Sequence, residues 1–166
     1  MTDSKKSSST KSDILKPADI DEILEQYNHL LKTYPNQKNA VYANYKRTIK
    51  RLDVLFPFIE HPVHGITGLH ALEKYDEAGY VRTYNYNWKI IIPKMGVQKH
   101  HISGWGNEPH DDPGTPEEFK IETEPHHHHY DLNDRKKRRE NYDVRTLEQA
   151  FEFISYYLIS GKEYKG

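Results

Sequence analysis

The sequence predicts an α+β fold with an N-terminal helical hairpin, an antiparallel sheet of about four to five strands, and a C-terminal helix packed on one sheet face. Apolar residues recur at helical spacing before residue 56 and again after residue 146. Between these regions the chain changes to short stretches rich in Tyr, Ile, Val and Thr, separated by turns that contain glycine. We therefore expect a disordered tail over residues 1–14, a helical hairpin over 15–56, and the sheet with its closing helix over 57–166.

The hairpin is predicted from two amphipathic runs. In the first, over residues 20–34, apolar side chains recur every three or four positions, Asp19 and Glu22 form a capping pair, and Pro35 ends the run. The second run, over residues 36–55, has apolar residues on one side and basic residues beside them. The two runs together predict a pair of packed helices.

The sheet is predicted from alternating patterns after Pro62. The expected strands span residues 68–75, 80–92, 99–105 and 119–130, with turns at 76–79 and 93–96. Residues 108–118 contain three prolines and no apolar anchor, which predicts a surface loop. The final helix begins with Thr146 and Gln149 as a capping box and ends at Gly161.

The composition excludes several classes of protein. The 166 residues contain no cysteine, which excludes disulfides, thiolate zinc sites and a cysteine nucleophile. Lys and Arg number 24 against 25 Asp and Glu, so the formal net charge is -1 and no global field attracts nucleic acid or a membrane. The N-terminus has no apolar core, which predicts neither a signal peptide nor an anchor. We expect a cytoplasmic protein with no membrane partner.

The run from His126 to His129 is the most unusual feature of the sequence, because imidazole acts as acid, base or metal ligand near neutral pH. On a strand, His126 and His128 would point to one face, and His127 and His129 to the other. Either pair could form an acid-base or substrate-binding site. The alternative is that two of the four pack under the last helix or against a neighbouring strand, while the other two are solvated.

The same histidines also suggest a metal site. His126 and His128 would offer two nitrogens to zinc from one strand, and His110 would supply a third ligand, with His100 or His101 as other candidates. We expect no cofactor, with zinc as the alternative.

Residues near the histidines could position a substrate. Trp105, Asn107 and His110 lie close together at a predicted strand end, where Asn107 could fix a substrate or a tautomer and His110 could transfer a proton. Tyr86 and Trp88 share one face of a strand and could stack nucleobases, although such aromatic rows also form cores. Aromatic and imidazole groups therefore gather in the segment between residues 84 and 130.

Three segments of the chain, in their order and spacing, resemble the TumE family of prokaryotic toxins. They are Tyr84-x-Tyr86-x-Trp88, the sequence Ile-Ser-Gly-Trp-Gly-Asn-Glu-Pro-His over residues 102–110, and Glu-Pro-His-His-His-His over residues 124–129. The closing helix is also similar, and the resemblance covers residues 66–161. It implies the toxin of a toxin-antitoxin pair, neutralised by a cognate antitoxin that is commonly a helix-turn-helix DNA-binding protein.

The resemblance also implies which residues act. Carried over to this chain, the family's histidines fall on His110, His126, His127 and His129, and its asparagine falls on Asn107. The sequence departs from the family pattern at Gly106, where an acidic residue is more usual, and at His128, where a basic residue is frequent. The predicted hairpin before residue 56 lies outside the family pattern.

The leading hypothesis is a toxin that cleaves RNA without a metal, with the histidines as general acid and base. Arg135, Arg138 and Arg139 of the basic run over residues 135–139 would hold phosphate, although such runs are often only solvated. No phosphate-binding Gly-rich loop, nucleophile elbow or His-Glu-x-x-His helix is present. The alternatives are a non-catalytic interaction module that docks through the hairpin and a His-ligated metal protein. The expected partners are a cognate antitoxin and RNA, and a homo-oligomer is left open.

Overall fold

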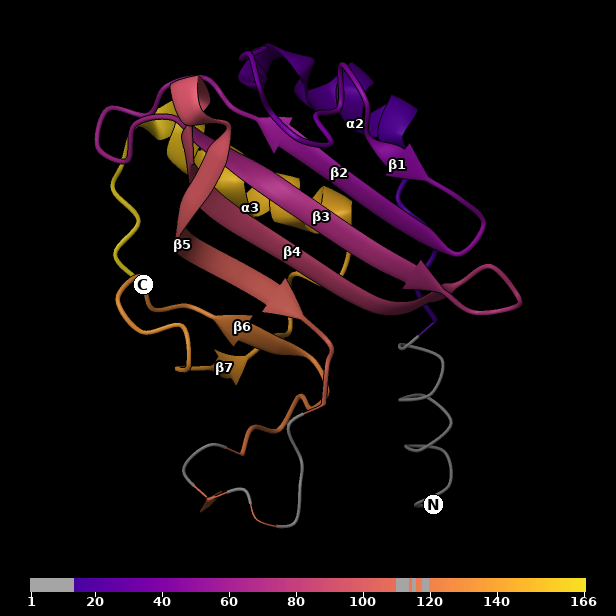
Figure 1. The fold of residues 1–166 in the computed structure, drawn as a ribbon. Coiled ribbons are helices and arrows are strands. Elements are labelled where there is room, and N and C mark those ends of the chain that lie inside the picture. Colours follow the sequence, from indigo (N-terminus) through magenta and orange to yellow (C-terminus); the bar gives the residue numbers. More distant parts are fainter. Residues whose placement is uncertain (1–13, 110–113, 115, 118–119) are drawn as a thin grey trace.

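The computed structural model describes residues 14–109, 114, 116–117 and 120–166, and its α+β fold confirms the predicted class. Within these residues, seven antiparallel strands form one sheet in which the strand order follows the chain order (Figure 1). The strands are β1 (Lys46–Arg47), β2 (Arg51–Pro57), β3 (Thr67–Tyr75), β4 (Val81–Ile92), β5 (Val97–Gly106), β6 (His127–His129) and β7 (Arg139–Glu140). The tail expected over residues 1–14 lies outside the described residues, apart from Ile14.

The two predicted turns connect the three longest strands. β3 and β4 are joined through residues 76–80, where Gly79 has a φ of 89° and its amide donates to the carbonyl of Asp76. β4 and β5 are joined by the 3₁₀ turn η2 (Pro93–Met95), which ends at Gly96 in the left-handed conformation. Glycine adopts such positive φ values without steric cost, so these positions were readable from the sequence.

The second predicted helix, over residues 36–55, is wrong. This segment forms turns, then β1 and β2, and the expected boundary between residues 56 and 57 falls inside β2. Leu52, Val54 and Phe56 fill the core from one face of the sheet, and Arg51 and Asp53 alternate with them. Leu55 is also buried, and its backbone carbonyl and amide bond to Val41 and Asn39. The sheet therefore has more strands than expected, and residues 15–56, all of which the structure describes, form no helical hairpin to serve as a docking element.

The first predicted helix is present but shorter. α2 (Ile20–Tyr27) is followed by the 3₁₀ turn η1 (Asn28–Leu30). Asp19 caps α2 as predicted, since its carboxylate accepts a hydrogen bond from the amide of Glu22.

The segment before α2 has no regular structure but is joined to the sheet. The carbonyl of Leu15 accepts from the amide of Val81 at 2.8 Å. The amide of Ala18 donates to the carboxylate of Glu73 at 3.0 Å, and the hydroxyl of Tyr86 donates to the same carboxylate at 2.5 Å. Glu73 is 1% exposed, so these donors replace the water that a carboxylate otherwise requires.

The final helix, α3 (Leu147–Ser160), confirms the prediction in its start, its end and its position. Thr146 and Gln149 form the reciprocal capping box, and Gly161 ends the helix with a φ of 72°. α3 packs on one face of the sheet, where the ring of Phe151 lies 4.8 Å from that of Phe56 and stacks on Tyr27 of α2 at 5.0 Å.

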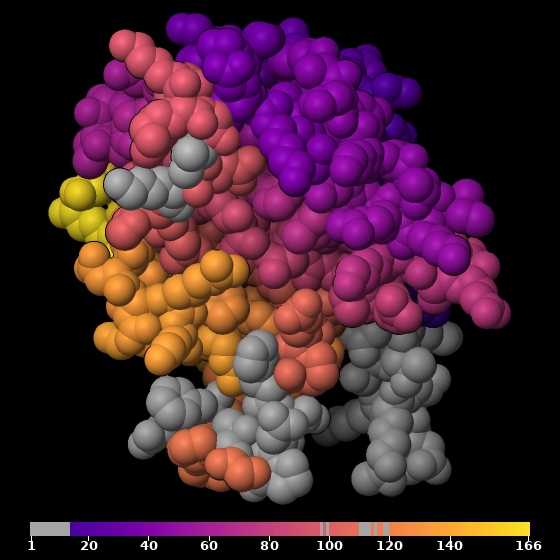
Figure 2. Space-filling view, viewed as in Figure 1, coloured from indigo at the N-terminus to yellow at the C-terminus, as the bar shows by residue number. Residues whose placement is uncertain are grey.

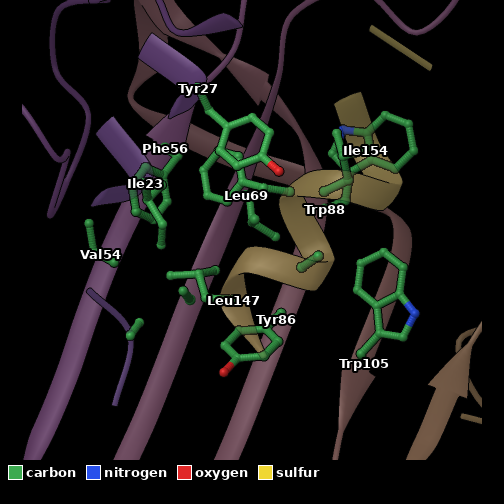
Figure 3. Packing of buried hydrophobic residues seen from close by; sticks show 14 of the residues in the cluster. Ile23, Tyr27, Val54, Phe56, Leu69, Tyr86, Trp88, Trp105, Leu147 and Ile154 are labelled. Carbon is green, nitrogen blue, oxygen red and sulfur yellow. The ribbon is translucent and has the colours of Figure 1, made fainter. Parts of the chain in front are cut away.

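The sheet consequently has two unlike faces. We call the face under α3 the inner face; it carries the aromatic side chains of β4 and β5 that lie beneath Leu147 and Ile154 (Figure 3). The outer face carries polar side chains at the alternate positions, including Asn85, Asn87 and Lys89 of β4. α3 lies behind the sheet in Figure 1, so Figure 2, from the same direction, shows the outer face.

Candidate functional site

The four consecutive histidines divide between the two faces, as strand alternation predicts. In β6, His127 pairs with Gly106 and His129 with Gly104 of β5, and both imidazoles lie on the outer face. An added Cβ on Gly106 would lie 3.2 Å from the carbonyl oxygen of Tyr84 and 3.4 Å from Nε2 of His127. Glycine at this position therefore allows the close approach of β4, and the imidazole lies within contact distance beside it.

A pocket of about 540 Å³ opens on the outer face beside these two imidazoles. We call it the histidine pocket; its lining residues are Tyr84, Asn85, Gly106, Glu108, His127, His129, Arg135, Lys136 and Arg138. Three cationic side chains and one carboxylate thus surround two imidazoles. Residues 127–140, which include β6 and the basic run, belong to the orange segment in Figure 2.

Backbone carbonyls orient both imidazoles. Nδ1 of His127 lies 3.0 Å from the carbonyl oxygen of Pro125, and Nδ1 of His129 lies 2.7 Å from that of Arg135. Because a carbonyl only accepts, each Nδ1 carries a proton, and Nε2 is the basic nitrogen of each neutral ring. The two ring centroids are 4.8 Å apart. This arrangement holds two potential proton-transfer groups side by side with the same tautomer.

The outer face beside the pocket is electropositive. Burial lowers the pKa of Lys89, and the charge of Arg135 lowers it further. Burial also lowers the pKa of His101 to about 4, again with a contribution from Arg135. Burial is the larger cause of both shifts, and the contribution of Arg135 shows that its positive charge acts on this part of the outer face.

Arg138 is held in place by a carboxylate. Its guanidinium lies 2.6 Å from Glu124, and both side chains are largely buried. A partly buried Arg–carboxylate pair has a defined geometry, which positions this cation at the pocket wall. Arg135 and Lys136, which are exposed, supply the remaining positive charge of the pocket.

His126 and His128 lie on the inner face and have structural contacts. The hydroxyl of Tyr84 lies 2.8 Å from Nδ1 of His126. His128 stacks on Trp105, and burial, followed by the charge of Arg139, lowers its pKa to about 3. The expected alternative, in which two of the four histidines pack under the last helix or against a strand, therefore describes this pair. Its other half is wrong for His127, which is 3% exposed and not solvated.

The hydrogen bonds of His128 fix its tautomer. Arg139 donates to Nδ1 of His128, so Nε2 carries the proton and donates to the hydroxyl of Ser103 at 2.6 Å. The Ser103 hydroxyl donates in turn to Tyr164, which donates to the carbonyl of Tyr130. Both ring nitrogens of His128 are thus used, and the ring is a neutral member of the core.

The aromatic side chains expected to bind a substrate are in the core instead. Tyr86 and Trp105 are each 1% exposed, and Trp88 is 0% exposed. Tyr86 donates to Glu73, and the indole of Trp88 donates to Thr67. The alternation was read correctly, but these residues face α3 and leave no room for a stacked base.

Two further expected residues do not line the histidine pocket. Asn107 accepts from the amide of Tyr84 and donates to the carbonyl of Arg82, so it connects the end of β5 to β4. Arg139 lies over the ring of Tyr130 and donates to His128. His110 lies outside the described residues.

The metal alternative finds no support in the geometry. Among the residues that the structure describes, no group of three or more His, Asp or Glu side chains is placed to hold a metal ion. His126 and His128 already bond to protein groups through the nitrogens described above, and the third expected ligand, His110, is not among the described residues.

Sequence reasoning missed three residues of the pocket. Lys136 lies in the basic run that was noted, and Asn85 lies on the strand face opposite to the aromatic row, so both had a signal in the sequence. Glu108 follows the end of β5 and had no such signal.

Comparisons with known proteins add no relative. No protein-family model, no curated protein and no solved structure matches this chain. The described helices include none that is long and apolar enough to cross a membrane. We therefore infer the function from the histidine pocket itself.

Proposed function

We propose that this protein is a metal-independent ribonuclease and the toxin of a toxin-antitoxin pair. The observation that carries the proposal is the histidine pocket, in which His127 and His129 lie beside Arg135, Lys136 and Arg138 on the outer face. His127 is 3% exposed and His129 is partly exposed. Two imidazoles can move protons, and the cations can hold a phosphodiester. The resemblance of the chain's motifs to the TumE family supports the toxin role and a cognate antitoxin as partner.

The proposed reaction needs only these parts. One imidazole accepts the proton of a ribose 2′ hydroxyl through Nε2, and the freed oxygen attacks the adjacent phosphorus. The bond from phosphorus to the 5′ oxygen of the next nucleotide breaks, and the second imidazole, in its protonated form, gives its proton to that oxygen. The products are a 2′,3′-cyclic phosphate and a 5′ hydroxyl. The cations stabilise the charge that develops on the phosphoryl oxygens.

The test is cleavage of a labelled RNA by the purified protein in the presence of a chelator. We expect products that end in 2′,3′-cyclic phosphate, and no cleavage of the same strand built from 2′-deoxynucleotides. His127→Asn and His129→Asn should each lower the rate by about 10²-fold or more, because each removes one proton-transfer group. His29→Asn is the matched control, since His29 is exposed in η1. Intact RNA, or full activity in both pocket variants, would show that the proposal is wrong.

The toxin role has its own test. Expression of the chain in a bacterium should arrest growth, and the double variant His127→Asn/His129→Asn should not. If both proteins arrest growth equally, the toxicity does not depend on His127 and His129, and this part of the proposal is wrong.

A further inference from the structure

A second pocket lies at the other margin of the sheet, between the turn that joins β1 to β2 and the turn that joins β3 to β4. Its volume is about 650 Å³. We call it the basic pocket; it is lined by Ile49, Lys50, Arg51, Lys74, Tyr75, Asp76, Glu77, Ala78, Gly79 and Arg82. Both turns extend at the right of Figure 1.

The lining of the basic pocket has four cationic and two acidic side chains, so its net charge is positive. Lys50, Lys74 and Arg82 form no salt bridge with any residue that the structure describes. Arg51 lies 3.7 Å from Asp53, whose other oxygen is 2.8 Å from His70. Of the two carboxylates in the lining, Asp76 accepts from the amide of Tyr80 and so holds the turn. The pocket is therefore a place where an external anion would be stabilised.

The register of the sheet places the basic pocket and the histidine pocket on the same face. Arg51 of β2 pairs with Lys74 of β3, and Lys74 pairs with Thr83 of β4. Asn85 lies two residues after Thr83 on β4 and therefore on the same face. It pairs with Gly106 of β5, which pairs with His127 of β6. β3 and β6 are separated by three strand spacings, or about 14 Å. A chain a few nucleotides long spans that distance.

We propose that a single-stranded RNA lies across the outer face, with its reacting phosphodiester in the histidine pocket and a flanking phosphate in the basic pocket. This inference rests on the proposed function and adds the class of substrate. A polynucleotide repeats its negative charge at every nucleotide, so it matches cations that occur at two separate places on one face. Between them the strand surface offers Thr83 and Asn85, neutral side chains that hydrogen-bond to sugar and base.

The experiment compares a long and a short substrate. The double variant Lys74→Ala/Arg82→Ala removes two cations of the basic pocket, and Lys94→Ala is the control, because Lys94 is exposed in η2 at the opposite end of β4. Binding of a single-stranded RNA of about 12 nucleotides is measured by fluorescence anisotropy over a range of salt concentrations. Cleavage of a dinucleotide is measured in parallel.

We expect the double variant to bind the long RNA about tenfold or more weakly and to lower the slope of log affinity against log salt by about 1.4, the value for two lost phosphate contacts. Its dinucleotide cleavage should equal that of the parent, and Lys94→Ala should match the parent in both assays. Unchanged affinity and slope for the long RNA would overturn the inference. A poly-glutamate peptide that displaces the long RNA and binds more tightly than it would also overturn the inference. A parent protein that binds the long RNA but cleaves neither it nor the dinucleotide would contradict the proposed function alone.

Discussion

Replacement of His128 by glutamine should remove much of the sensitivity of this fold to acid. His128 is 5% exposed, and its pKa is lowered to about 3 by burial and then by Arg139. In the unfolded chain the same imidazole takes up a proton near its ordinary pKa of about 6.5. Between these two values the unfolded state binds more protons than the folded state, so stability falls as the pH falls.

The magnitude follows from the two pKa values. Between about pH 7.5 and about pH 5, the unfolded imidazole becomes almost fully protonated while the folded one stays neutral, which costs about 2 kcal/mol of unfolding free energy. A glutamine side chain can still donate to Ser103 through Nε2 and accept from Arg139 through Oε1, but it does not titrate. The variant should therefore lose about 2 kcal/mol less than the parent over this range.

The assay is urea unfolding, followed by tryptophan fluorescence, of both proteins at the two pH values. We compare how much unfolding free energy the parent and the variant each lose between the two pH values. The other titrating groups are common to both proteins, so the difference reports on His128. His29→Gln, at an exposed position, is the control and should behave like the parent. If the parent and His128→Gln lose equal stability on acidification, His128 is not the buried neutral imidazole described here.

Two further predictions concern packing. Phe151 of α3 contacts the rings of Tyr27, Phe56 and Phe58, so Phe151→Ala should lower the unfolding free energy by about 3–5 kcal/mol in the same urea assay. A Cβ on Gly104 would lie 2.5 Å from the side-chain oxygen of Asn87, so Gly104→Ala should lower the melting temperature, whereas Gly114→Ala, which meets no atom within 4 Å, should not. A Gly104→Ala protein as stable as the parent would contradict the close packing of the Asn87 side chain against Gly104.

The sequence contained enough information for the elements that local signals define. The cap at Asp19, the capping box of Thr146 and Gln149, and the turn at Gly96 depend on neighbouring residues alone. β2 was missed because its apolar residues fit two periods at once. Ile49, Leu52 and Leu55 repeat every three residues, as in a helix, while Leu52, Val54 and Phe56 repeat every two. Pairing with β3, a long-range event, selects the second period.

The site shows the same division between local and long-range information. Alternation along β6 correctly separated His127 and His129 from the other two histidines. Alternation does not indicate which face α3 covers. The aromatic residues of β4 therefore fit a substrate-binding role as well as a core role in the sequence, and the structure places them in the core. Arg138 and Arg139 are adjacent in sequence, yet one lines the pocket and the other bonds to His128, a difference that depends on the position of β7.

The contacts of the segment before α2 determine how short this protein can be. Glu73 is sealed in the interior and receives one of its hydrogen bonds from the amide of Ala18, while Leu15 binds the first residue of β4. A version that started at Ile20, the first residue of regular structure, would strip a donor from an enclosed carboxylate, at a cost of about 1–3 kcal/mol. The minimal folding unit therefore starts no later than Leu15, in a stretch that a secondary-structure diagram would leave out.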